Sequence, residues 1–398
     1  MDELLKWRSE FPILESTVYM ISNSLGAMPR KVYDRMKEYA DTWATRGVRA
    51  WAEGWWDMPV GVGDHIGRII GAAPGEVSMH QNVTIAEAIV SSCFDFTPPR
   101  NRVVYTDMNF PSVNYLYQEE ARRGAEVVVV PSPDGIGVPT EALLSAIDER
   151  TLLVPISHIL FRSAYIQDAE TIIRHARRMG AHVVLDVFQS AGIVPLDVKA
   201  LDVDFVVGGV LKWLCGGPGG AFLYVRPDLA RKLEPRLTGW MAHVHPFDFE
   251  GGRVRLREDG FRFLNGTPAI PALYAVEPGC SIVSEIGVDA IRKKSTRQTA
   301  RLMELAEENG LSTRTSVDSA RRGGTVSIDV PHGYEISREL IRRNFLVDYR
   351  PEAGVRVSPH FYTQDEELEL TIRELVEIRD SKAYEAHALP TGVKAKVT

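Results

Sequence analysis

Between residues 103 and 225 the chain alternates short β-branched runs with amphipathic segments, and this alternation limits the fold more than any other feature. Segments such as AETIIRHARRMG (169–180) have the spacing of amphipathic helices. The runs between such segments are VVYT (103–106), EVVVVP (126–131), TLLVPISH (151–158), HVVLDV (182–187), DFVVGG (204–209) and AFLYV (221–225). Runs this apolar are typical of strands buried on both faces. The pattern predicts a mostly parallel sheet covered by helices on both faces.

The pattern changes after about residue 270. A long helical pattern covers about 271–309, GTVSIDV (324–330) follows it, and another helix is expected near 334–345 before a last charged helix. At 398 residues and 44% hydrophobic content, the chain can bury more than one core. We therefore expect an N-terminal segment that joins the small domain (1–60), a large cofactor-binding domain (61–270) and a small C-terminal α+β domain (271–398).

Charge and composition exclude several classes of partner. The net charge of −7 and the lack of a dense Lys/Arg run argue against nucleic acid. The amino terminus, MDELLKWRSEFPIL, carries acids where a secretory signal is basic, and no apolar run approaches membrane-spanning length. Cys93, Cys215 and Cys280 are too scattered for a disulfide framework or a C-x-x-C metal site. We expect a cytoplasmic protein with a small-molecule substrate and no metal, membrane or nucleic-acid partner.

Candidate functional residues lie where the expected strands end, because open α/β sheets bind ligands at the carboxyl ends of their strands. Asp186 ends the run HVVLD, and Lys212 follows VVGG. Asn82, Val83 and Thr84 precede the helical run IAEAIVSSC, and a helix start favours a phosphate dianion. Further candidates at strand ends are Asn109, Phe110, Ser157 and His158.

A carboxylate, a lysine and a helix start are the groups that pyridoxal 5′-phosphate requires of a protein. The carboxylate keeps the pyridine nitrogen protonated, the lysine forms a Schiff base, and fixed donors hold the phosphate. Lys212 lies between apolar runs and the glycines of GGPGG (216–220), where desolvation lowers the pKa of an amine and makes it nucleophilic. GGPGG lacks the spacing of a dinucleotide fingerprint. The simpler alternatives are that Asp186 stabilises a turn and that Thr84 only caps a helix.

The run VVLDVFQSAGIVPLDVKALDVDFVVGGVLKWLCGGPGGAFLYVR (183–226) resembles the cofactor segment of fold-type-I, class V aminotransferase-like pyridoxal phosphate enzymes. The resemblance implies a large domain with a mostly parallel seven-stranded sheet and a small C-terminal α+β domain. It implies that Asp186 pairs with the pyridine nitrogen, Gln189 bonds the ring hydroxyl, and Lys212 is the Schiff-base lysine. Thr84, next to Val83 in NVT, would hold the phosphate. GTP (266–268) resembles the loop whose threonine, here Thr267, reaches the phosphate of a neighbouring subunit, which implies a homodimer with shared active sites.

Several further stretches resemble kynureninase within that group. The matching stretches are NSLGAMP (23–29), NFPS (109–112), GWMAH (239–243), FRFLN (261–265) and RPEAGVRVSP (350–359). The resemblance implies that Phe110 stacks on the cofactor ring, Trp240 contacts the phosphate, and Asn265 faces the aromatic part of the substrate. Arg356 would bind the substrate α-carboxylate, for which a bidentate guanidinium is suited. Without the resemblance, it is equally plausible that Arg356 forms an ion pair at the surface.

The kynureninase resemblance predicts hydrolysis of the Cβ–Cγ bond of a kynurenine-type amino acid to an aryl acid and alanine. Leu211 stands where kynureninase has a tyrosine before its lysine, and Gln189 stands in place of a histidine. These departures keep open a class V lyase acting by β-elimination on a C–S bond, or an aminotransferase or epimerase acting on another amino acid. In RAWAEGWWD (49–57), Trp51 and Trp55 are candidates for stacking on an aryl substrate, or for simple packing.

Overall fold

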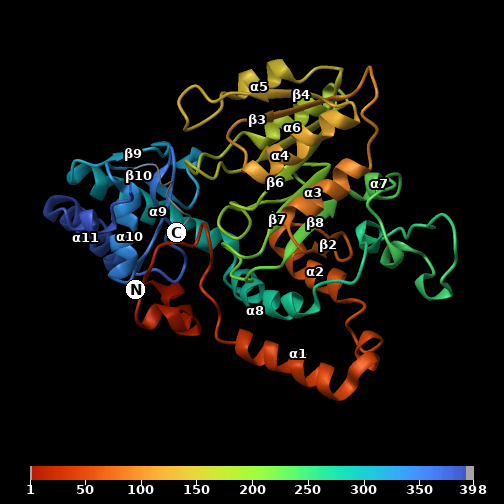
Figure 1. The fold of residues 1–398 in the computed structure, drawn as a ribbon, viewed down its shortest axis with the longest axis horizontal. Coiled ribbons are helices and arrows are strands. Elements are labelled where there is room, and N and C mark those ends of the chain that lie inside the picture. Colours follow the sequence, from red (N-terminus) through yellow and green to blue (C-terminus); the bar gives the residue numbers. More distant parts are fainter. Residues whose placement is uncertain (1, 391–398) are drawn as a thin grey trace.

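A computed structural model describes residues 2–390 of the chain (Figure 1). Its centre is a seven-stranded sheet with the strand order β2-β8-β7-β6-β5-β3-β4. All neighbouring strands pair in parallel except β8, which is antiparallel to both β2 and β7. The predicted mostly parallel sheet is therefore confirmed. The strands are β2 (Val77–His80), β3 (Arg102–Thr106), β4 (Glu126–Val130), β5 (Thr151–Ser157), β6 (His182–Asp186), β7 (Phe205–Gly209) and β8 (Ala221–Val225).

The two faces of this sheet are buried in separate hydrophobic cores, which explains why its strands read as continuous apolar runs. Val183 and Leu185 of β6 face one core, and Val184 between them faces the other. Helices cover the sheet on both faces (Figure 1). Residues of α2 (Met58–Ile70), α5 (Thr140–Ala146), α6 (Ala169–Arg178) and α8 (Ile270–Ile286) belong to the first core. Residues of α3 (Val83–Ser92), α4 (Pro111–Glu119) and α7 (Pro227–Ala230) belong to the second.

A smaller unit follows with its own sheet in the order β12-β13-β10-β9. The prediction of a single long helix over 271–309 is wrong in one respect, because Gly287 separates α8 from α9. Gly287 has φ +82° and ψ +134°, a positive-φ conformation that glycine adopts at little cost and that ends the helix. The elements of this unit are α9 (Val288–Glu308), β9 (Ser312–Thr313), β10 (Val326–Asp329), α10 (Gly333–Arg342), β12 (Asp348–Arg350), β13 (Gly354–Val357) and α11 (Asp365–Ser381).

The amino-terminal segment connects the small sheet with the large domain. Its strand β1 (Val18–Tyr19) pairs in parallel with β11 (Phe345–Leu346), and Ile21 forms a β-bridge with Ser358. The backbone N–H of Gly26 then donates to the carbonyl of Leu211 at 2.8 Å, beside the predicted lysine. The next helix, α1 (Val32–Arg46), packs against α8.

Short 3-10 helices complete the connections: η1 (Glu3–Glu10), η2 (Pro12–Glu15), η3 (Gly47–Trp51), η4 (Glu120–Arg123), η5 (Trp240–Ala242), η6 (Pro246–Asp248), η7 (Gly260–Phe263), η8 (Ser319–Arg321) and η9 (Ala383–His387). Among residues 2–390, no helix combines the length and the apolar character needed to span a membrane.

Candidate active site

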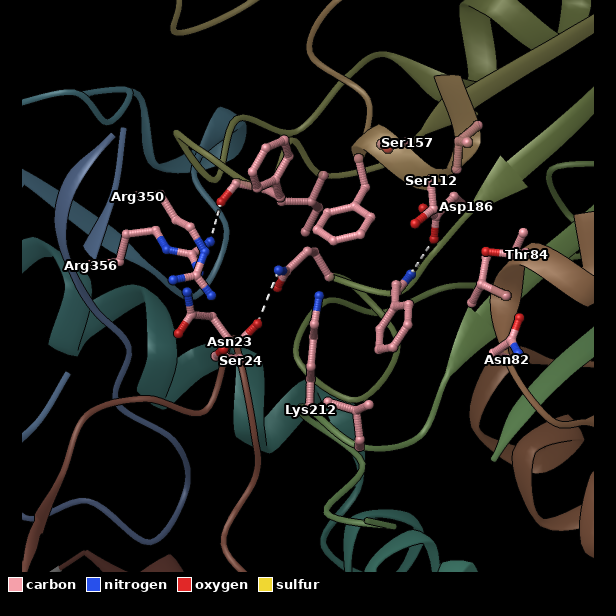
Figure 2. Close-up of a pocket in the computed structure, with 18 residues that line it drawn as sticks. Asn23, Ser24, Asn82, Thr84, Ser112, Ser157, Asp186, Lys212, Arg350 and Arg356 are labelled. Atoms are coloured by element: carbon pink, nitrogen blue, oxygen red, sulfur yellow. Dashed lines mark hydrogen bonds between the residues drawn. The ribbon is translucent and has the colours of Figure 1, made fainter. Parts of the chain in front are cut away.

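A cavity of about 320 Å³ lies at the carboxyl ends of β5, β6 and β7, where the small sheet approaches the large one (Figure 2). It is lined from the amino-terminal segment, the start of α3, the loops after β3, β5, β6 and β7, and the strands β12 and β13. The lining residues are Asn23, Ser24, Asn82, Val83, Thr84, Phe110, Ser112, Val113, Ser157, Ile159, Phe161, Asp186, Phe188, Gln189, Leu211, Lys212, Arg350 and Arg356.

Lys212 lies three residues after β7 and extends into the middle of the cavity (Figure 2). Its Nζ is 4.1 Å from the centroid of the Phe188 ring and 5.7 Å from that of Phe110. Burial lowers the pKa of Lys212 below its ordinary value, the positive charge of Arg356 lowers it further, and Asp186 opposes both. A larger fraction of the amine is therefore neutral and nucleophilic near neutral pH.

Asp186 is the last residue of β6 and is 6% exposed. One carboxylate oxygen, Oδ1, accepts the backbone N–H of Phe188 at 2.9 Å. Burial raises the pKa of Asp186 above its ordinary value, whereas that N–H and the charge of Lys212 act to lower it. A cation bound beside this carboxylate, such as a protonated ring nitrogen, would compensate the burial and keep the group ionised.

The carboxamide of Gln189 is fixed in one orientation by two buried partners. Its Oε1 accepts the indole N–H of Trp213 at 3.1 Å, and its Nε2 donates to the backbone carbonyl of Asn23 at 3.0 Å. These bonds leave one N–H of the amide and one lone pair of its oxygen. Towards the cavity, Gln189 can act as a donor to an oxygen atom.

The start of α3 forms one end of the cavity, and Arg350 and Arg356 lie at the other end (Figure 2). The side chain of Asn82 caps the helix by accepting the backbone N–H of Ile85 at 3.0 Å. Val83 and Thr84, the first two helical residues, line the cavity with the free N–H groups of a helix start nearby. This end suits an anion such as a phosphate.

Arg356 on β13 is 3% exposed, so it is not the surface ion pair of the simpler interpretation. Its Nε donates to Oδ1 of Asp348 at 2.8 Å and its Nη2 to Oδ2 at 2.5 Å, and its Nη1 donates to the carbonyl of Phe161 at 2.6 Å. Arg350 also lines the cavity, and its Nη2 lies 3.1 Å from Oδ2 of Asp348. Two arginines therefore share one buried carboxylate, which leaves one net positive charge for an anionic ligand.

Two of the predicted substrate residues lie away from this cavity. Trp55 is 8% exposed, and its indole N–H donates to the hydroxyl of Tyr274 on α8 at 3.1 Å. Trp51 packs edge-on against Trp55, with ring centroids 5.6 Å apart. In this chain Trp55 lies between Tyr39 of α1 and Tyr274 of α8, and the predicted contact of both tryptophans with a substrate stays a prediction.

Trp240, Asn265 and Thr267 also lie outside the cavity, in the segment that runs from η5 to the start of α8. The Trp240 side chain is 40% exposed and packs against the ring of Trp56 at 5.0 Å. A Cβ atom added at Gly239 would lie 2.5 Å from the backbone carbonyl oxygen of Asn265. The predicted contacts of Trp240 with the phosphate, of Asn265 with the aromatic part of the substrate, and of Thr267 with the phosphate of a neighbouring subunit stay predictions.

Several lining residues were not predicted, notably Asn23, Ser24, Phe188 and Arg350. Asn23 and Arg350 stand in the stretches NSLGAMP and RPEAGVRVSP, so those motifs carried a signal. By contrast, Asn109 has a structural role, because its Nδ2 donates to the carbonyl of Pro155 and its Oδ1 accepts the N–H of Ser157.

Comparison with known proteins gives the following similarities. Residues 18–370 match the family model described as "Aminotransferase class-V". An uncharacterised aminotransferase of Bacillus subtilis is 32% identical, covering 93% of this chain and 96% of that protein. The kynureninase of Pseudomonas fluorescens is 30% identical, covering 96% of this chain and 94% of that protein. A solved structure of a variant of the cystine C–S lyase C-DES, with glycine covalently linked to its pyridoxal phosphate, matches with a TM-score of 0.83 and 20% identity, covering 93% of this chain and 99% of that one.

Proposed function

The chain belongs to the class V aminotransferase family and is a pyridoxal phosphate-dependent enzyme, and from this premise we propose that it is a kynureninase-like hydrolase. The proposed reaction cleaves the Cβ–Cγ bond of a kynurenine-type amino acid with water and releases an aryl acid and alanine. The proposal rests on one cavity that combines Lys212, Asp186 and Arg356, in a chain similar to kynureninase over nearly its whole length.

The polar groups that line this cavity match those that pyridoxal phosphate needs for binding. The start of α3 at Thr84 would hold the phosphate, Asp186 would pair with the ring nitrogen, and Gln189 would donate its remaining N–H to the ring oxygen. Lys212 lies between this end and Arg356 (Figure 2). The aromatic ring of Phe110, which is 44% exposed, is available for stacking on a planar group.

When bound, pyridoxal phosphate supplies an electron sink conjugated to the substrate amine. Lys212 is the group that would take the proton from the substrate Cα, because burial and Arg356 lower its pKa and increase the fraction of free amine. Asp186 would hold a proton at the ring nitrogen through its buried carboxylate. These two residues therefore control where protons reside during the reaction.

Arg356 would orient the substrate by binding its α-carboxylate while Asp348 and the carbonyl of Phe161 fix the guanidinium. Water adds to the γ-carbonyl, and the Cβ–Cγ bond then breaks. The oxygen of the water ends in the aryl acid, and Cβ gains a proton to become the methyl group of alanine. Phe161 and Phe188 line the cavity and would pack against the aryl group.

A second candidate function keeps the cofactor and changes the chemistry. Leu211 lines the cavity as an apolar residue where the kynureninase resemblance expects a tyrosine, so a hydroxyl is missing beside the lysine. This favours β-elimination or transamination on another amino acid, with pyruvate or a keto acid as the product. In either case we propose that the enzyme is a homodimer with shared active sites, in which Thr267 reaches the phosphate of the neighbouring subunit.

The test is to mix the cofactor-saturated protein with L-kynurenine or 3-hydroxykynurenine and to measure aryl acid, alanine and pyruvate together. Release of aryl acid with an equal amount of alanine supports the hydrolase, and Lys212→Ala serves as the blank. Pyruvate or a keto acid without aryl acid would reject the hydrolase in favour of the second candidate.

A further inference from the structure

Asn23 has an unusual environment for a buried amide. Its residue is 1% exposed, and neither Nδ2 nor Oδ1 has a hydrogen-bond partner among residues 2–390. A buried amide without partners costs free energy unless a ligand supplies them. Asn23 also lines the candidate active site, at the end that contains Arg350 and Arg356 (Figure 2).

The backbone around Asn23 is fixed from both sides. The carbonyl of Asn23 accepts the Gln189 amide at 3.0 Å, and the N–H of Ser24 donates to the carbonyl of Ile21 at 2.9 Å. The N–H of Gly26 donates to the carbonyl of Leu211 at 2.8 Å. The unpaired carboxamide is therefore held in place on a rigid segment, as expected of a group that binds a ligand.

The charges at this end of the cavity indicate that the ligand is an anion. Arg350 and Arg356 share the single carboxylate of Asp348, so one positive charge is left over. Three of the five N–H groups of Arg356 are used by Asp348 and Phe161, which leaves two. A carboxylate has about four lone-pair sites, so it needs more donors than Arg356 alone can offer.

We propose that Asn23 is a substrate-binding residue that donates its Nδ2–H to the carboxylate of the amino-acid substrate, alongside Arg356. The inference rests on the amino-acid chemistry proposed above, but it does not depend on which bond of the side chain is cleaved. It makes the free carboxylate a requirement for tight binding, so amines without a carboxylate are disfavoured.

The experiment measures equilibrium binding through the absorbance of the cofactor, not turnover. The cofactor-loaded protein is titrated with L-alanine and, separately, with ethylamine, which has the amine but no carboxylate. In wild type we expect L-alanine to bind more tightly. Asn23→Ala should weaken the binding of L-alanine by about 10- to 100-fold, the usual contribution of a hydrogen bond to a charged group. Ethylamine binding should not change.

Two further variants sharpen the test. Asn23→Asp keeps the size but replaces the donor with a negative charge, so it should weaken L-alanine binding at least as much as Asn23→Ala. Ser295→Ala is the matched control, because the Ser295 hydroxyl is also buried without a partner among the described residues but lies on α9, outside the cavity. It should leave both affinities unchanged.

Three outcomes would overturn the proposal. The wild-type protein shows no preference for L-alanine over ethylamine, Asn23→Ala binds L-alanine as tightly as wild type does, or Asn23→Ala loses affinity for both ligands equally. Cofactor absorbance after purification shows whether each variant is loaded. Failure to hydrolyse kynurenine would reject the proposed reaction but would not affect this binding comparison, so the two failures are distinguishable.

Discussion

The carboxylate of Asp348 holds the guanidinium of Arg356 side-on, with Nε 2.8 Å from one oxygen and Nη2 2.5 Å from the other. Asp348 is fully buried, and burial raises the pKa of its carboxyl, but Arg356 and then Arg350 outweigh that effect and lower the pKa overall. The pair joins β12 to β13 and orients the arginine that faces Lys212 across the cavity.

Asp348→Asn should destabilise the protein strongly, because it removes the only carboxylate shared by two arginines in the described part of this site. Breaking a buried ion pair costs about 3–5 kcal/mol. The measurement is the free energy of unfolding by urea at constant cofactor saturation. Glu352→Gln is the matched control, since Glu352 pairs with Arg162 in the same region but its side chain is 68% exposed. A change of about 1 kcal/mol or less is expected there, and an equally small effect of Asp348→Asn would contradict the role assigned to the pair.

Lys212 gives a prediction about pH. Only the neutral amine can capture pyridoxal phosphate, and burial together with Arg356 lowers the pKa of Lys212. The rate of cofactor capture by the cofactor-free protein should therefore rise with pH and level off well below pH ~10.4, the ordinary lysine value. Stopped-flow absorbance measures this rate, and Lys212→Ala is the blank.

Arg356→Met tests the cause of the shift. Removing the positive charge makes the protonated amine more favourable, so the inflection of the capture rate should move to higher pH. An inflection at the same pH as in wild type would show that burial alone sets the reactivity of Lys212.

The sequence predicted the parts of the site that follow directly from strands. A buried strand appears in the sequence as an apolar run, so its end can be located. Asp186 was found as the polar residue that ends β6, and Lys212 as the polar residue just beyond β7. The break at Gly287 was missed because the helical periodicity continues across it, and only the backbone conformation ends α8 there.

Contacts between distant segments could not be read in the same way. Asn23 lies 166 positions before the Gln189 that holds its carbonyl, and no local pattern links them. Trp51 and Trp55 show the opposite problem: a dense aromatic run indicates burial but not against which surface. The structure packs Trp55 against Tyr274 of α8 and Trp51 against Trp55, and neither lines the cavity.

Glu87 gives a prediction about stability against pH. It is fully buried on α3, and Tyr117 donates to its Oε2 at 2.6 Å. Burial raises the pKa of Glu87 to about 8. The unfolded chain therefore releases this proton at lower pH than the folded chain, so the group contributes stability at low pH that is lost as pH rises towards 8.

Glu87→Gln removes the titration while keeping the shape and the acceptor for Tyr117. Between about pH 5 and 8, the free energy of unfolding should then fall less steeply with pH than in wild type. The difference between the two slopes should be about 1.4 kcal/mol per pH unit. Urea unfolding at pH 5, 6, 7 and 8 measures the slope. The exposed Glu141→Gln is the control and should keep the wild-type slope. Parallel slopes for wild type and Glu87→Gln would show that Glu87 is ionised in the folded protein.

Gly26 leads to the last prediction, because the backbone of the amino-terminal segment touches that of the lysine loop there. A Cβ atom added at Gly26 would lie 2.1 Å from the carbonyl oxygen of Lys212 and 2.9 Å from Sγ of Cys215. The backbone must move to relieve such a contact, so Gly26→Ala should displace Lys212 and reduce the amount of cofactor retained after purification.

Gly61→Ala is the control, because Gly61 is an exposed position of α2 with open space around it. There alanine should raise stability by about 0.5–1 kcal/mol and leave cofactor absorbance unchanged. If Gly26→Ala keeps full cofactor absorbance, Lys212 is positioned by its own loop and not by the amino-terminal segment.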